Sequence, residues 1–246
     1  MNTNIHETEK YDRLPHGKLL KLGGVFAIIG GLGYFITLLF HGDLPDQTTE
    51  IALQHIASRP EWRLLKLSLI ISLIFWVAAF EIFHKSTKEI ISRLFSRLAV
   101  IMGSIGVAIV IAEYSMIGYA LKEVADRWII ATGEEPEIYL NMARIILSIS
   151  SGLFHSFIIW MIGLPYILIG IAVTTNNNYH TWYGWVSVFL GCGVLIAGII
   201  RFLGIDLVPY PILYGGFIIP LTLWLVGLGY FMWLKSKSEL TTTESQ

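Results

Sequence analysis

Three ionisable residues lie inside long apolar runs of the sequence, where a lipid bilayer makes a charge costly. They are Glu113, His155 and Arg201. A carboxylate, an imidazole and a guanidinium can bind a polar ligand, pair with one another or move a proton. A guanidinium accepts a carboxylate partner readily because it cannot be neutralised by losing a proton. Each of the three is therefore a candidate site residue.

The three residues fall at a similar predicted depth. Glu113 and Arg201 each follow a predicted inner-face residue by 16 positions, and His155 lies 18 positions from Val173. At 1.5 Å of rise per residue, all three would lie roughly 25 Å from the inner face, in the outer half of the bilayer. A weak similarity between the third and fifth apolar runs sets Glu113 opposite Arg201, which makes an ion pair between them geometrically feasible.

Two interpretations of these residues stay open. In the first, Glu113 and Arg201 pair to hold a helix bundle together, and His155 hydrogen-bonds to a hydroxyl such as that of Ser115 or Ser151. In the second, the three residues face a polar pocket that opens to the outside and bind a ligand or move a proton. Four further residues would line the mouth of that pocket: His41, Tyr34, Tyr114 and Tyr214.

The composition is that of a membrane protein. Hydrophobic residues make up 54% of the chain and charged residues only 14%, with a mean hydropathy of +0.65, which is too apolar for an ordinary soluble domain. A net charge of −1 provides no basic field, so nucleic acid is not an expected partner. The single cysteine, Cys192, excludes a disulfide within one chain.

No motif of a known cofactor or reaction is present. The sequence holds no HxxxH, HExxH, Walker A or GxSxG pattern, so we predict no metal and no cofactor, and we favour a protein that is not an enzyme.

Six apolar runs predict an all-α bundle of six transmembrane helices between residues 21 and 235. Each run has about the twenty residues that a hydrocarbon layer of ~30 Å requires. A polar leader covers 1–20 and a polar tail covers 236–246. The predicted spans are 22–40, 64–83, 98–120, 153–173, 183–203 and 212–234.

Two features between the spans are also predicted. Thr48 or Thr49 can cap a short helix that runs through Ala57. After Tyr119 the helical pattern continues into charged sequence, and a helix resumes at 137. Spans three and four should therefore form a long hairpin that projects beyond the membrane.

The basic residues predict the orientation. Ten of the 17 Lys and Arg residues lie on the side of the N-terminus, and the turn after the second span is strongly basic. Because basic residues concentrate in cytoplasmic loops, we expect both termini in the cytoplasm and the hairpin outside, in a bacterial cytoplasmic membrane.

Two segments of the C-terminal half carry a family resemblance. The segments are HSFIIWMIGLPYILIGIAV and YGWVSVFLGCGVLIAGI. They resemble a bacterial family of six-helix membrane proteins that is defined only as a domain of unknown function. An HS pair and spaced glycines carry the resemblance, at His155, Ser156, Gly163, Gly170 and Gly184; the family's proline before that last glycine is replaced here by NNNYHTW. The resemblance implies the six-helix architecture, singles out His155 and implies no activity.

Three functional hypotheses follow from these observations. The first is a non-enzymatic protein that binds, transports or senses a small or lipid-like ligand in an outward-facing pocket. The second is an enzyme acting on a lipid or quinone-like substrate, with His155 as general base and Arg201 holding an anion. The third is a structural or partner-binding subunit that uses the hairpin as its contact. Membrane lipids are expected partners in every case, and the sequence does not predict an oligomeric state.

Overall fold

The structure describes residues 16–41, 48–205, 207 and 209–244, and most of these residues are helical. In this computed structural model, six helices among those residues are long and apolar enough to cross a membrane. The predicted all-α class is thereby confirmed for these residues, and the six apolar helices of spanning length agree with a multi-pass helical membrane protein. Most of the predicted leader, residues 1–15, lies outside the described part.

The helices run further than the predicted spans. In chain order they are α1 (His16–His41), α2 (Thr49–Ala57), α3 (Trp62–Ser86), α4 (Ile90–Ser115), η2 (Met116–Leu121), α5 (Lys122–Ile130), α6 (Glu135–Phe157), η3 (Ile158–Gly163), α7 (Leu164–Thr174), α8 (Thr181–Phe202), α9 (Tyr210–Leu213), η4 (Tyr214–Ile218) and α10 (Ile219–Glu244). The three η segments are π-helical turns that continue the helices on either side.

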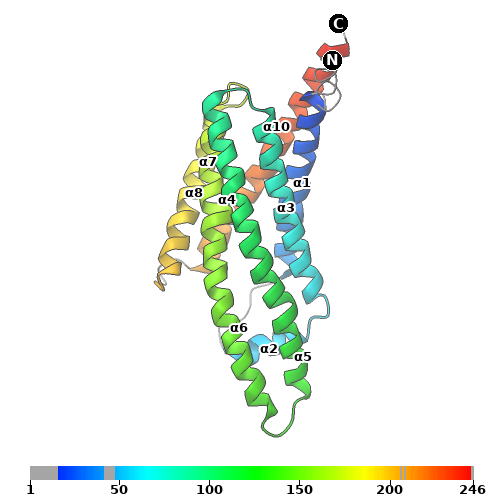
Figure 1. Cartoon of the computed structure of the whole chain (residues 1–246), viewed down its shortest axis with the longest axis vertical. Helices are drawn as coiled ribbons and strands as arrows, with labels where there is room; N and C mark the ends of the chain where they lie inside the picture. The colour runs from blue at the N-terminus through cyan, green and yellow to red at the C-terminus, as the bar shows by residue number, and fades with distance from the viewer. Residues whose placement is uncertain (1–15, 42–47, 206, 208, 245–246) are drawn as a thin grey trace, which may run out of the picture.

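The six spans form a closed bundle in sequence order. Helix α1 packs against α3 and α10, α3 against α4, α4 against α7, and α7 against α8, while η4 and α10 close the ring against α8. The first turn of α1 and the last turns of α10 lie at the same end of the bundle (Figure 1). Tyr166 fills the centre, where its ring meets those of Trp76, Phe80 and Trp224.

The third and fourth spans are much longer than a bilayer is thick. They cover 41 and 40 residues, or roughly 60 Å at helical rise, against a hydrocarbon layer of ~30 Å. Their far ends, α5 and the first half of α6, pack together at the end away from the first turn of α1, with α2 beside them (Figure 1). We call α2, α5 and residues 135–147 of α6 the cap.

A second hydrophobic core holds the cap together, separate from the core of the bundle. Its buried members are Leu53, Ile56, Trp62, Ile117, Leu121, Val124, Ala125, Leu140 and Ala143. The N-cap of α2 is Thr48, one of the two threonines that the sequence offered, and its hydroxyl oxygen accepts a hydrogen bond from the Ile51 amide at 3.4 Å.

Two of the π-helical turns precede a proline. Pro165 follows η3 and Pro220 follows η4. Proline has no amide hydrogen and its ring clashes with the carbonyl four residues earlier, so the helix widens where that bond cannot form. The third turn, η2, contains no proline.

Close backbone contact between α7 and α8 depends on two glycines. A Cβ at Gly184 would lie 2.5 Å from the Gly170 carbonyl oxygen, and a Cβ at Gly170 would lie 2.8 Å from the Gly184 oxygen. Small residues allow membrane helices to approach in this way, where van der Waals packing replaces the hydrophobic effect.

We predict that Gly184→Ala destabilises the protein by about 1–3 kcal/mol, because the added methyl group must separate two backbones. Gly152→Ala is the matched control, since a Cβ at that helical position meets nothing within 4 Å, and alanine favours a helix over glycine by about 1 kcal/mol. Thermal unfolding of both variants in detergent checks this. Equal melting temperatures for the two would contradict it.

Candidate functional site

Glu113 is a buried carboxylate in the last turns of α4. Its side chain is only 2% exposed, and its Oε1 accepts a hydrogen bond from the Ser150 hydroxyl of α6 at 3.0 Å. Its Oε2 is buried and receives no hydrogen bond from the described residues. A carboxylate in this position is expensive unless a positive charge lies near it.

Lys66 of α3 provides that positive charge. The residue is 5% exposed and interacts electrostatically with Glu113, although no hydrogen bond joins them. Its Nζ atom lies 4.8 Å from the centre of the Trp62 ring and 4.9 Å from that of Tyr114, so two aromatic faces hold the ammonium. One of the two interpretations of the sequence gave this role to Arg201, but Glu113 interacts with residues of α3 and α6, whereas Arg201 belongs to α8.

Sequence reasoning missed Lys66 because it lies close to Trp62 and Arg63, which suggest an interfacial anchor. A signal was nevertheless present. Lys66 occupies the same three-to-four residue repeat as Trp62, Leu69 and Leu73, and all four are buried. A lysine on the apolar face of a spanning helix points into the bundle.

A cleft of about 590 Å³ lies between α3 and η2, next to this pair. Its polar wall includes Lys66, Arg63, Tyr114 and Tyr119, and the remaining wall is mostly apolar. Glu113 does not line the cleft, so Lys66 is the member of the pair that a ligand in the cleft would meet.

Gly118 of η2 allows Lys66 to reach this wall. A Cβ on Gly118 would lie 2.9 Å from Lys66 Cβ. The neighbouring Ile117 carbonyl accepts a hydrogen bond of 3.0 Å from the Trp62 indole N–H. The Trp62 side chain thus provides a hydrogen-bond donor for a carbonyl of the π-helical turn. This bond explains how the irregular backbone is stable without a proline.

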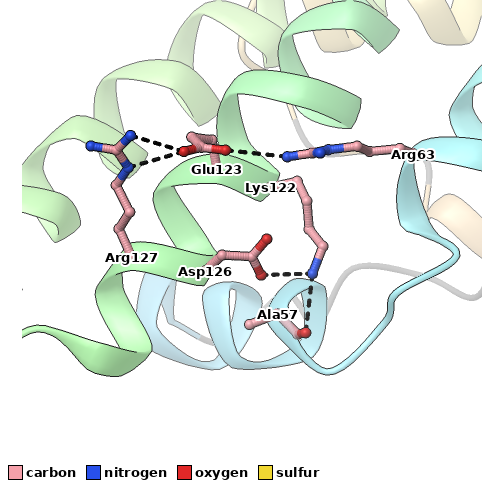
Figure 2. A network of polar contacts seen from close by, with 6 residues as sticks. All are labelled: Ala57, Arg63, Lys122, Glu123, Asp126 and Arg127. Carbon is pink, nitrogen blue, oxygen red and sulfur yellow. Dashed lines mark hydrogen bonds and ion pairs between the residues drawn. The ribbon is translucent and has the colours of Figure 1, made fainter.

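Arg63 is fixed from the cap side by a network of ion pairs (Figure 2). Its Nη2 lies 3.2 Å from Glu123 Oε2, while Arg127 binds the other oxygen of that carboxylate at 2.9 Å. Lys122 bonds to Asp126 at 2.7 Å and to the Ala57 carbonyl at 3.1 Å. The network joins α2, α3 and α5 immediately beside the cleft.

Two of the predicted tyrosines belong to the site. Tyr114 lines the cleft. Tyr34 of α1 is fully buried against Trp76, with ring centres 4.9 Å apart. The hydroxyls of Tyr34 and Tyr114 approach one another, although the geometry at Tyr34 falls short of a normal hydrogen bond.

The other predicted residues lie elsewhere or border the site. His155 is half-buried beside the Phe154 ring, which stacks on Tyr214 of η4. Tyr214 also interacts electrostatically with Tyr114. Arg201 is buried in the last turn of α8. The side chain of His41 lies outside the described residues.

No family model, no curated protein and no solved structure matches this chain. The resemblance of its C-terminal half to a six-helix family therefore stays a prediction. Within the described residues, no three His, Cys, Asp or Glu side chains come together in a way that could hold a metal ion.

Replacing one member of the buried pair should cost more than replacing both. Lys66→Met and Glu113→Gln should each destabilise the protein, by about 3 kcal/mol if the remaining charge stays buried. The double variant should recover most of that loss, because neither charge is then left alone. Thermal unfolding of the four proteins measures the coupling, with Lys85→Met, an exposed position on the same helix, as control. Additive losses would mean that the two groups do not depend on each other.

His55 lies in α2, outside the spanning helices, and should make the stability of the cap depend on pH. Burial lowers the pKa of His55, and Arg59 nearby lowers it further. A histidine whose pKa is lower in the folded than in the unfolded state destabilises the fold when it is protonated. Stability should therefore fall as the pH drops through about 6.5, the ordinary histidine value. Melting temperatures from pH 8 to pH 5 should fall less steeply in His55→Gln; parallel curves would contradict this.

Proposed function

We propose that the chain is a non-enzymatic protein of a bacterial cytoplasmic membrane that binds a small or lipid-like ligand, and transports or senses it, in an outward-facing cleft. One observation carries the proposal: Lys66, a nine-tenths buried cation opposite a buried carboxylate, lines a cleft of about 590 Å³. Ionisable groups within spanning segments are costly and mark ligand or ion sites by default.

The distribution of basic residues supports the outward direction of the cleft. Four basic residues lie in or near the connection between α3 and α4: Lys85, Lys88, Arg93 and Arg97. This connection lies at the same end of the bundle as the first turn of α1 (Figure 1). Under the positive-inside rule this end is cytoplasmic, and both termini with it. The cap and the cleft then belong to the outer side, where the cap projects beyond the lipid.

The walls of the cleft favour binding over the enzymatic alternative. A general base must come within hydrogen-bond reach of the substrate, but neither His155 nor Arg201 lines this cleft. The apolar part of the wall suits the hydrocarbon portion of a ligand, and the cationic part can fix its orientation, as in most small-molecule sites.

Blocking the cleft tests the proposal. Leu67→Trp places a bulky ring in the cleft, whereas Ile71→Trp adds the same ring one turn away on the same exposed face, outside the cleft lining. We expect protein purified in mild detergent to retain a bound small molecule or lipid, detected by native mass spectrometry. Leu67→Trp should lose that species and Ile71→Trp should keep it.

Equal occupancy in both variants, or no bound species in either and no thermal stabilisation by a lipid extract, would refute a ligand site here.

A partner-binding role is a second candidate, and one observation favours it. Helix α6 exposes an apolar stripe with helical spacing along its cap portion and just below it: Ile138, Met142, Ile145 and Ile149. If this stripe binds a partner protein, Ile138→Ser combined with Ile145→Ser would release a co-purifying chain without changing ligand occupancy of the cleft.

A further inference from the structure

The ammonium group of Lys66 lacks hydrogen-bond acceptors. An ammonium has three donors, yet within the described residues Lys66 Nζ donates no hydrogen bond, and its contacts are the faces of two aromatic rings. By contrast Lys122, equally buried, bonds to both a carboxylate and a carbonyl. A buried charge without acceptors is costly, so the Lys66 donors are set for an acceptor that enters from the cleft.

The charge of the cleft specifies the sign of that ligand. Lys66 and Arg63 both line it, and the carboxylate that balances Lys66 does not. Arg63 binds Glu123 through Nη2 and stacks on the Tyr119 ring at 4.8 Å, which holds its guanidinium in one place. A cationic head group would be repelled here, whereas a carboxylate or phosphate oxygen would meet two cations.

The remaining wall specifies an apolar part of the ligand. Leu67, Ile70 and Met116 continue the cleft away from the two cations. Leu67 is half-exposed, and Ile71 and Ile74 follow it on the outer surface of α3. In a spanning helix this surface faces lipid, so the cleft is open sideways to hydrocarbon chains.

We propose that the cleft binds an acidic amphiphile, with an anionic carboxylate or phosphate head group on Lys66 and Arg63 and an alkyl chain along Leu67 and Ile70. This inference rests on the proposed function and narrows its ligand to one chemical class. The head group supplies the acceptors that Lys66 lacks, and the chain leaves the cleft toward the outer leaflet.

Binding to the full-length protein in nanodiscs or detergent tests the class with four kinds of probe. Oleate presents a carboxylate and dioleoylphosphatidylglycerol presents a phosphate. Oleyl alcohol and dioleoylphosphatidylcholine carry the same chains without net negative charge. Acetate and inorganic phosphate present the head group without a chain. We expect one or both acidic amphiphiles to bind at least tenfold more tightly than their neutral partners and than the chain-free anions. Binding of oleate would indicate a carboxylate head group, and binding of dioleoylphosphatidylglycerol a phosphate head group.

Variants assign the binding to Lys66. Lys66→Met should weaken binding of the acidic probe at least tenfold, as expected for loss of a charge-assisted hydrogen bond. The double variant Lys66→Met with Glu113→Gln should show the same loss without the stability defect, so misfolding does not explain it. Lys66→Arg should restore binding to within about threefold, and Lys85→Met should bind like the parent.

Three results would overturn the proposal. In the first, neutral amphiphiles bind as tightly as acidic ones, and their binding is blocked by Leu67→Trp but unaffected by Lys66→Met. This result would exclude the acidic class but would still support a ligand site in the cleft. Chain-free anions that bind as tightly as oleate would exclude the amphiphile. Binding of no probe, or only binding that Leu67→Trp does not block, would reject both the ligand class and the cleft.

Discussion

The cost of burying the charge of Glu113 is the constraint on which this end of the bundle depends. A carboxylate that is 2% exposed in a spanning helix requires a compensating charge, and Lys66 provides it from α3. The buried lysine is itself costly, and cation–π contacts with the faces of Trp62 and Tyr114 offset part of that cost. The glycine at 118 is needed for the stem of Lys66 to pass η2. Helices α3, α4 and η2 are thus held in register by one electrostatic requirement, and the cleft lies between them.

Trp62 connects the parts of the molecule that this requirement brings together. Its ring faces the ammonium of Lys66, its indole N–H satisfies the Ile117 carbonyl of the π-helical turn, and its side chain belongs to the second hydrophobic core. A shift of the cap would therefore move the indole, the widened turn and the cation together. The ion pair of Arg63 with Glu123 likewise couples α3 to the cap. Cap position and cleft geometry are mechanically linked through these two neighbouring side chains.

The sequence was sufficient for the architecture and only partly sufficient for the site. Apolar length alone identifies the six helices that are long enough to span a membrane. The cap of α2 was narrowed to Thr48 or Thr49 because capping is a local interaction. Glu113 was found because a lone carboxylate in an apolar run is conspicuous. Its partner was not, because pairing depends on which helix faces lie together, and no local pattern indicates whether α3 or α8 faces α4. The periodicity that buries Lys66 with Leu69 and Leu73 was available, but the nearby Trp62 and Arg63 favoured an interfacial interpretation.

The glycines that join α1 to α10 have a consequence for how the protein is made. A Cβ at Gly24 would lie 2.6 Å from the Gly229 carbonyl oxygen, and one at Gly229 would lie 2.7 Å from the Gly24 oxygen. Helix α1 therefore makes close backbone contact with α10, which lies more than 170 residues later in the sequence. During synthesis α1 enters the membrane while α10 has not yet been translated. Until then the glycine surface of α1 is covered by lipid or by the insertion machinery. The ring of six helices therefore closes only after α10 has entered the membrane, so α10 is the helix that seals the bundle.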